Sequence, residues 1–482
     1  MSDDAVTESD RRPVHRDGDT DVAAVIEELR SGLPAEVLSI DADLLATYST
    51  DRAMFVEPGR PIALVRVRDT AQVQHVMRTA TRYRVPVVPQ GARSGLAGAA
   101  IAVDGAILLN VEKMNKVLDI DMANRLVVTQ PGILNAELSR KVAEHGLFYP
   151  PDPASWEFCS IGGNLSTNSG GLCCVKYGVT TDYVLGLELV LADGRVLRTG
   201  RRTVKGVAGY DLTRLVVGSE GTLGVITEAT LSLRPKTEQP LTVVGTFASC
   251  AQAAEAVSEV VSRGITPSML EFMDNASVRA VNEAYKMGFD EGCQAMLLAQ
   301  SDIGGDRAEA EIAALAELFT ASGGEVVVAD DPEEGEVLMG ARRQVLTAFE
   351  RFGTTMIDDV CVPRDRLVDL VEGVEKLAEK YSLLVGVVGH AGDGNFHPTV
   401  CFDATDPEQS ARAKELFDAI MELSLDLGGT ITGEHGVGTM KMDLLEREVG
   451  EVSLDLHRGI KAAFDPLGIL NPGKVFRPSQ SR

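Results

Sequence analysis

The stretch PVVPQGARSGLAGAA, residues 86–100, places a glycine-rich loop directly after a short apolar strand. Two further glycine clusters follow it, one at residues 162–171 and one at residues 218–224. Glycine lets backbone N–H groups approach a ligand without an intervening Cβ, and successive exposed N–H groups form a concave anion site that suits a pyrophosphate. Turns explain a single cluster better, but three clusters favour a nucleotide site. None of them matches Gly-x-Gly-x-x-Gly or a P-loop, so a standard NAD or ATP site is not supported.

The alternation of strands and helices around this stretch divides the chain into two halves. Short apolar strands alternate with helices from about residue 60, and proline and charge interrupt the pattern at residues 231–240. The alternation then restarts with different spacing, which suggests an α+β domain on a smaller sheet. A chain of 482 residues is also too long for one ordinary core. We therefore predict a flexible tail at residues 1–19, a first domain at 20–237, a second at 238–470 and a C-terminal segment at 471–482.

Composition and charge exclude several classes of protein. With 44% hydrophobic and 24% charged residues, the chain has the composition of a soluble globular protein. The net charge of −25 disfavours binding to nucleic acid or anionic lipid. No apolar run reaches the length of a transmembrane helix, and the N-terminus lacks the apolar core of a signal peptide. Seven cysteines without a Cys-x-x-Cys pair indicate neither a disulfide framework nor a zinc ribbon, so we expect a cytoplasmic protein.

Three of the seven histidines fall in two glycine-rich segments of the second half. His390 and His397 lie in HAGDGNFH, and His435 follows Glu434 in TGEHGVG. The spacing of the first pair is not helical, and the glycines between them predict a turn that folds the second ring toward the first. Two imidazoles and one carboxylate would suit Zn²⁺, Mn²⁺ or Fe²⁺ with positions left open for substrate. Any one of these histidines alone is more often structural, but the glycine-rich flanks favour a site.

Taken together, the motifs resemble a known family. The stretches at residues 86–100, 150–171 (PPDPASWEFCSIGGNLSTNSGG) and 209–227 (GYDLTRLVVGSEGTLGVIT) are similar to the FAD-binding, PCMH-type domain of vanillyl-alcohol-oxidase-like flavoproteins. More narrowly, they resemble the branch of D-lactate dehydrogenase, glycolate oxidase and D-2-hydroxyglutarate dehydrogenase, from about residue 40 to Phe476. The resemblance implies a two-domain α+β flavoprotein whose C-terminal, ferredoxin-like domain binds the substrate.

The resemblance also implies which residues hold FAD. The binding is expected to be non-covalent, because the loop at residues 91–98 contains no histidine. Arg93 stands where relatives often carry threonine, and a cation beside two phosphates is electrostatically favourable. Lys474 lies in a C-terminal segment that returns to the flavin in the family. The residues implied to contact FAD are Pro89, Gly91, Ala92, Arg93, Ser94, Gly95, Leu96, Gly98, Pro153, Ser160, Gly163, Asn164, Thr167, Gly170, Gly171, Glu220, Gly221, Ile226 and Asn471.

Carried over by position, the second-half motifs supply the metal and substrate contacts. His390, His397 and Glu434 would be metal ligands, and His435 the general base. Arg342 would grip the substrate carboxylate, with Arg343 as the second candidate, since a guanidinium matches a carboxylate bidentately. Asn395 would contact the substrate as well.

The expected substrate follows from the absence of residues that would bind a second carboxylate. Relatives that act on 2-hydroxyglutarate carry extra polar residues, including a lysine, for the second carboxylate. The corresponding FGTTMIDD at residues 352–359 has none, and Leu346 and Thr399 also fit that substrate poorly. We therefore expect oxidation of D-lactate or a glycolate-like 2-hydroxy acid, with D-2-hydroxyglutarate as the alternative.

Two alternatives come from other functional classes. A non-catalytic flavin subunit that only relays electrons could lose the metal residues, and a metallohydrolase would not need the glycine clusters. For the dehydrogenase, no residue pattern decides between a quinone, a cytochrome, an electron-transfer flavoprotein and oxygen as the electron acceptor. We also expect a homodimer, with peripheral contact at the inner membrane face as a further expectation.

Overall fold

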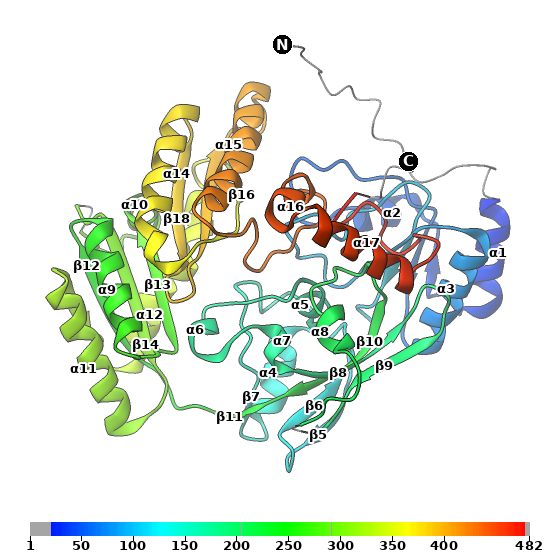
Figure 1. Ribbon diagram of the computed structural model, residues 1–482, viewed down its shortest axis with the longest axis horizontal. Helices are drawn as coiled ribbons and strands as arrows, with labels where there is room; N and C mark the ends of the chain where they lie inside the picture. Colours follow the sequence, from blue (N-terminus) through cyan, green and yellow to red (C-terminus); the bar gives the residue numbers. More distant parts are fainter. Residues whose placement is uncertain (1–20, 204, 291, 478–482) are drawn as a thin grey trace.

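The computed structural model describes residues 21–203, 205–290 and 292–477, and Figure 1 shows their arrangement. The proposed tail at residues 1–19 lies outside the described residues. Two regions lie side by side: an N-terminal region that ends near residue 237, and a cap region that begins at the next strand. No helix among the described residues is both long enough and apolar enough to cross a membrane.

The first sheet of the N-terminal region positions the glycine-rich loop. Its strand order is β1-β2-β4-β3, and the pairs β2/β4 and β3/β4 are parallel. Nearly all residues of β2 and β4 are buried, as expected for parallel strands that are covered on both faces. The loop begins where β3 ends, at the carboxyl edge of the parallel strands. The elements are α1 (Val22–Gly32), β1 (Leu38–Ser39), α2 (Ala42–Tyr48), β2 (Ala63–Arg66), α3 (Thr70–Tyr83), β3 (Val87–Gln90) and β4 (Ile107–Asn110).

The second sheet is antiparallel and carries the other two glycine clusters on its connections. Its strand order is β5-β6-β10-β8-β9. Along β10, buried and half-buried residues alternate toward the end, which is typical of a sheet with one solvated face. The elements are β5 (Val117–Asp121), β6 (Leu126–Thr129), α4 (Asn135–Ala143), α5 (Ile161–Thr167), α6 (Cys174–Tyr177), α7 (Thr180–Tyr183), β8 (Val184–Val190), β9 (Val196–Gly200), α8 (Leu212–Val216) and β10 (Val225–Ser232), with β7 (Leu147–Phe148) paired to β11 (Arg234–Pro235).

One eight-stranded antiparallel sheet forms the cap region. Its order is β15-β12-β14-β13-β18-β19-β16, and β17 also pairs with β19. The strands are β12 (Leu241–Phe247), β13 (Met269–Asp274), β14 (Ala295–Ser301), β15 (Glu325–Val328), β16 (Thr354–Ile357), β17 (Val360–Cys361), β18 (Leu384–His390) and β19 (Asn395–Phe402). The helices are α9 (Cys250–Ser262), α10 (Asn275–Tyr285), α11 (Gly305–Ala321), α12 (Pro332–Arg343), α13 (Val345–Phe349), η2 (Arg364–Arg366), α14 (Leu367–Tyr381) and α15 (Pro407–Asp426).

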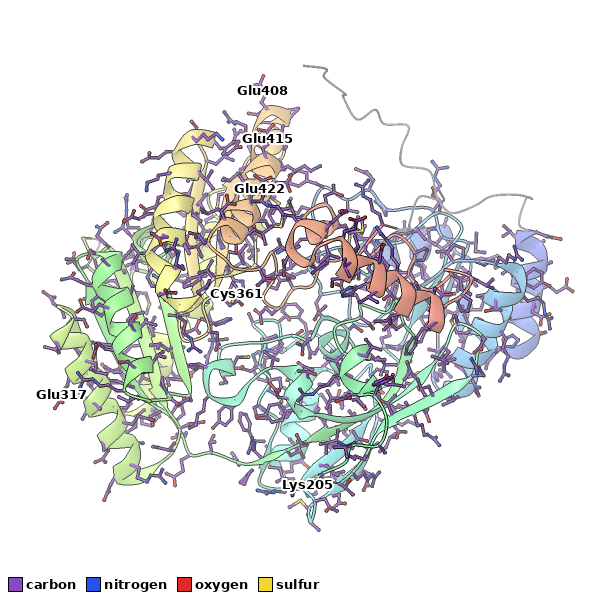
Figure 2. All side chains as sticks on the ribbon, viewed as in Figure 1. Lys205, Glu317, Cys361, Glu408, Glu415 and Glu422 are labelled. Atoms are coloured by element: carbon purple, nitrogen blue, oxygen red, sulfur yellow. The ribbon has the colours of Figure 1, made fainter. Side chains whose placement is uncertain are left out.

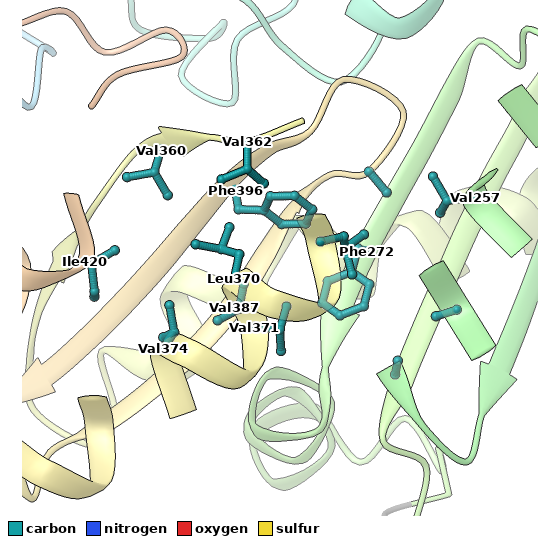
Figure 3. Packing of buried hydrophobic residues seen from close by; sticks show 14 of the residues in the cluster. Val257, Phe272, Val360, Val362, Leu370, Val371, Val374, Val387, Phe396 and Ile420 are labelled. Carbon is teal, nitrogen blue, oxygen red and sulfur yellow. The ribbon is translucent and has the colours of Figure 1, made fainter. Parts of the chain in front are cut away.

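Helices cover both faces of this sheet, so its central strands are buried. On one face, residues of α9, α11, α14 and α15 form a single apolar cluster with the sheet, and α10, α12 and α13 contribute to a second cluster. Figure 3 shows the first cluster, where Phe272 of β13 and Phe396 of β19 pack edge to face. On α15, Glu408, Glu415 and Glu422 recur every seven residues and lie on the exposed face (Figure 2).

The C-terminal helices bring the chain back to the N-terminal region. α16 (Met442–Val449) and α17 (Glu451–Phe464) lie over that region in Figure 1. Leu470 forms a parallel bridge with Val87 of β3, and the N–H of Asn471 donates to the Val87 carbonyl. The predicted two-domain α+β fold is confirmed. The boundaries at residues 237/238 and 470/471 stay a proposal.

Candidate active site

A cavity of about 1130 Å³ lies between the two regions. One end is lined by the loop that follows β3, and the other by residues from the ends of β18 and β19 and from the turn at residues 432–438. It therefore joins the two sets of residues that the sequence singles out. Most of the residues implied to contact FAD line it: Pro89, Gly91, Ala92, Arg93, Ser94, Gly95, Leu96, Pro153, Gly163, Asn164, Thr167, Glu220, Gly221 and Ile226.

The loop at residues 91–96 presents its backbone to the cavity. Among the described residues, the N–H groups of Arg93, Ser94, Gly95 and Leu96 meet no protein acceptor. Such a run of free N–H groups suits a diphosphate. A Cβ on Gly91 would collide with Ser160 Oγ, so the first glycine is required for the loop to approach α5.

Ser160 holds the loop in place, and Asn164 lies on the same helix, α5. Ser160 caps α5, and its Oγ accepts hydrogen bonds from the N–H groups of Ala92 and Gly163. The Asn164 amide donates to Ser169 Oγ. Ser160 does not line the cavity, and neither do Gly98, Gly170, Gly171 and Asn471. These residues therefore shape the cavity walls from behind.

Glu220 connects the third glycine cluster to the turn at residues 432–438. Its backbone has a φ of +50°, and its carboxylate accepts hydrogen bonds from the N–H groups of Val437 and Gly438, both at 2.8 Å. Burial raises the pKa of Glu220 to about 7 against the opposing effect of these N–H donors. Asn471 donates to the Glu220 carbonyl, and Lys474 donates to the Gly98 carbonyl. The C-terminal segment thus braces the loop, without reaching the cavity through Asn471.

Arg93 points away from the expected diphosphate site. Its Nη1 donates to the carbonyl of Thr47 at 2.7 Å, and the guanidinium lies 4.1 Å from the centre of the Tyr48 ring. A cation over an aromatic face is attracted by the ring quadrupole. The side chain therefore anchors the loop to the end of α2.

His390, His397 and Glu434 converge at the far end of the cavity. The predicted turn between the histidines is the β18–β19 hairpin, in which His390 pairs with Asn395. His390 Nε2 and His397 Nε2 lie 3.4 Å apart, and Glu434 Oε1 lies 3.7 Å from the first and 3.4 Å from the second. Ligands about 2.1 Å from a tetrahedral ion would be about 3.4 Å apart. The three atoms therefore have the spacing of a metal site.

Buried carboxylates set the electrostatics of this cluster. Burial alone would lower the pKa of His390, but Glu271 and Glu434 raise it well above its ordinary value. Burial would raise the pKa of Glu434, but hydrogen bonds and charge from His390 and His397 hold it well below its ordinary value. The carboxylates thus favour a positive charge at this position, which a divalent ion would supply.

Two residues that orient the cluster were not predicted from the sequence. Glu271 of β13 accepts a hydrogen bond from His390 Nδ1 at 2.7 Å. Asp359 accepts from the N–H groups of Glu434 and His435 and from the amide of Asn395, so it fixes the turn that carries both residues. The signal is present in the sequence, since each is an acid inside a buried apolar strand or at its end. Such acids are almost never fully buried unless they are paired.

His435 and Arg342 complete the cavity lining near the cluster. His435 stacks on His397, and its Nε2 lies 4.0 Å from Glu434 Oε1. Burial lowers the pKa of His435, which favours the neutral ring that a general base needs. Arg342 Nη2 lies 3.0 Å from Glu271 Oε2. Its Nε is buried without an acceptor among the described residues.

The side chains of the other two substrate candidates are already paired with protein groups. The amide of Asn395 donates to Asp359 Oδ1 at 2.8 Å and to the Val360 carbonyl at 3.1 Å, and this residue does not line the cavity. Arg343 lines the outer part of the cavity, but it is exposed and paired with Glu336. Asn395 therefore supports the turn, and Arg342, whose side chain is 12% exposed, is the guanidinium beside the cluster.

Comparisons with known proteins decide the family. Residues 61–200 match the family described as FAD binding domain, and residues 236–475 match FAD linked oxidases, C-terminal domain. The chain is 41% identical over 419 residues to glycolate oxidase subunit GlcD of Bacillus subtilis (strain 168). The aligned residues cover 86% of this chain and 89% of the relative. The chain belongs to the FAD-linked oxidases.

Other relatives place this FAD-linked oxidase in the same branch. It is 36% identical to glycolate oxidase subunit GlcD of Escherichia coli (strain K12), over 95% of this chain and 91% of the relative. It is 34% identical to the mitochondrial D-lactate dehydrogenase [cytochrome] of Arabidopsis thaliana, over 99% of this chain and 87% of the relative. Among solved structures, p-cresol methylhydroxylase shares the fold with a TM-score of 0.79 at 20% identity, over 95% of this chain and 97% of that one.

FAD is the cofactor of this FAD-dependent dehydrogenase, and the cavity fits it. The free N–H groups at residues 93–96 suit the diphosphate, and the volume of about 1130 Å³ accommodates a large ligand. The family excludes the metallohydrolase alternative, because the match to the FAD binding domain at residues 61–200 covers the first two glycine clusters.

Proposed function

We propose that this FAD-linked oxidase oxidises a short D-2-hydroxy acid, D-lactate or a glycolate-like acid, to the 2-oxo acid with the help of a divalent metal. The observation that carries the proposal is the convergence of His390, His397 and Glu434 on the cavity that the FAD-binding loop also lines. The names of the relatives, glycolate oxidase and D-lactate dehydrogenase, agree with this substrate class.

Each residue at this end of the cavity has a distinct role in the proposed reaction. His390 Nε2, His397 Nε2 and Glu434 would hold the ion, and the Arg342 guanidinium would bind the substrate carboxylate. His435 would remove the hydroxyl proton, since its lowered pKa keeps the ring neutral. When bound, FAD supplies the acceptor for the hydride that leaves Cα, and the ion lowers the pKa of the substrate hydroxyl.

The lining of the cap side supports a short substrate with one carboxylate. Leu346, Ile357, Val388 and Thr399 line the cavity on this side. No lysine occurs among the described lining residues, and Arg343 is already paired. A second carboxylate would therefore be buried against an apolar wall without a cation, which costs free energy. This disfavours D-2-hydroxyglutarate.

The proposal is tested by anaerobic reduction of the yellow protein, whose metal content is measured first, with a panel of D- and L-2-hydroxy acids. We expect D-lactate or glycolate to bleach the flavin and L-lactate to leave it oxidised. Removal of the metal by a chelator should prevent bleaching while FAD stays bound. Bleaching by D-2-hydroxyglutarate alone would show that this acid is the substrate instead, and absence of any bleaching would overturn the proposed substrate class.

Replacement of the proposed base separates its role from binding. His435→Asn should retain FAD and metal but slow flavin reduction by about 100- to 10,000-fold. An unchanged rate would show that another group takes the proton. The reoxidant (a quinone, a cytochrome or an electron-transfer flavoprotein), the homodimer and the cytoplasmic location belong to the same proposal.

A further inference from the structure

Glu271 is a fully buried carboxylate in the middle of an apolar strand. Its neighbours on β13 include Leu270 and Phe272, which belong to the core of the cap region. In the sheet, Glu271 lies opposite His390 of β18. A buried acid is costly unless charged or hydrogen-bonded partners compensate it.

Two partners compensate this carboxylate, and each is a different part of the proposed site. Oε1 accepts the hydrogen bond from Nδ1 of His390 at 2.7 Å, and Oε2 lies 3.0 Å from Nη2 of Arg342. The second contact is an ion pair rather than an aligned hydrogen bond. One carboxylate thus bridges a proposed metal ligand and the proposed substrate anchor.

We propose that Glu271 is a positioning residue that sets both the metal affinity and the substrate affinity of this site. The inference rests on the proposed function. By accepting from Nδ1, Glu271 selects the tautomer of His390 whose Nε2 lone pair faces His397 and Glu434. By pairing with Arg342, it holds a long side chain in place, so less rotamer entropy is lost when the substrate carboxylate binds.

The bridge predicts that the two functions respond differently to substitution. Glu271→Gln keeps an oxygen acceptor for His390 and nearly the same volume, but it removes the charge and can turn an amide N–H₂ toward Arg342. Metal affinity should fall because the ligand becomes less basic, and substrate affinity should fall because Arg342 loses its partner. Neither effect requires a change of fold.

Asp274 on the same strand provides a matched control. Its buried carboxylate accepts from the N–H groups of Ser277 and Val387 and contacts no residue of the cluster. Asp274→Asn should lower thermal stability but leave Zn²⁺ affinity and the KM for D-lactate unchanged. A purely structural role of Glu271 would give the same pattern as this control.

The experiment titrates Zn²⁺ against a competing chelator into metal-stripped protein that retains FAD, and then measures KM and kcat with D-lactate. For Glu271→Gln we expect Zn²⁺ affinity to fall by about 10- to 100-fold, with a higher KM. Glu271→Asp, which keeps the charge on a shorter side chain, should recover part of both losses and serves if the glutamine variant does not fold.

A double variant tests the contact between Glu271 and Arg342. In an Arg342→Met background, Glu271→Gln should raise KM no further but should still weaken Zn²⁺ binding. Unchanged Zn²⁺ affinity and KM in the single variant would overturn the inference while leaving the proposed function intact. If the unsubstituted protein binds no Zn²⁺ or other divalent ion, the proposed metal site fails, and the inference fails with it.

Discussion

The two ends of the cavity are built from different parts of the polypeptide. At the FAD end, the loop at residues 91–96 offers mainly backbone N–H groups, and glycine matters because a Cβ would collide with Ser160. At the other end, side chains from β13, β18, β19 and the turn at residues 432–438 meet around one point. A backbone site tolerates changes of side chain that avoid a collision, whereas a side-chain site fails when one member is lost.

The largest expected effect comes from removing one member of the cluster. His397→Ala should slow flavin reduction by D-lactate at least about 1,000-fold, because a metal supplies several kcal/mol of stabilisation to the reacting hydroxyl. FAD content should not change, since the backbone end is intact. Stopped-flow bleaching with flavin and metal analysis measures both, and the exposed His145→Ala is the control. If FAD content fell together with the rate of flavin reduction, the two ends of the cavity would not be independent.

A steric collision at the FAD end of the cavity should lower FAD affinity and leave metal binding unchanged. Gly91→Val places a branched side chain against Ser160 Oγ, so we expect FAD affinity to fall by about 100-fold, equivalent to a few kcal/mol of overpacking. Zn²⁺ binding to the cluster should remain. Gly459→Ala on α17, where a Cβ meets open space, is the matched control. Retained FAD affinity would mean that the loop can move away from α5.

Removal of the guanidinium should affect substrate binding more than chemistry. Arg342→Met should raise the KM for D-lactate by about 10- to 100-fold, the value of a charge-assisted hydrogen bond, with a smaller change in kcat. Steady-state kinetics measures both constants. Arg343→Met, which removes the exposed and already paired neighbour, should change KM less than about threefold. Equal effects of the two substitutions would remove Arg342 as the sole anchor.

The smallest effect is expected at Arg93, although it lies in the FAD-binding loop. Its guanidinium stacks on Tyr48, so Arg93→Ala should lower the free energy of unfolding by about 1 kcal/mol. FAD affinity should change less than about threefold. Fluorescence titration of the apoprotein with FAD and thermal unfolding check the two values. A tenfold loss of FAD affinity would instead indicate that the Arg93 guanidinium contacts the phosphates of FAD.

Local patterns made part of this site predictable. The loop after β3 could be predicted from the sequence, because glycine is required where a backbone approaches another element closely. The β18–β19 hairpin could be read because Gly392 and Gly394 interrupt two apolar runs, and it brings His390 and His397 together as expected.

Contacts between distant strands could not be predicted in the same way. His390 and Glu271 are 119 residues apart in the chain, and Asp359 meets Glu434 across 75 residues. Asn395 illustrates the consequence. Its place in the hairpin suggested a substrate contact, but Asp359 holds its amide behind the turn.

The sequence by itself determined the two-region α+β fold, the glycine-rich FAD loop and the hairpin that brings His390 and His397 together. These depend on residue type and short spacing, which the chain specifies locally. Only the tertiary structure decided which carboxylate orients which ligand, that Arg342 pairs with Glu271 and that Arg93 turns toward Tyr48. The physical reason is that buried charges choose their partners by the packing of whole strands and helices, and no local pattern encodes that packing.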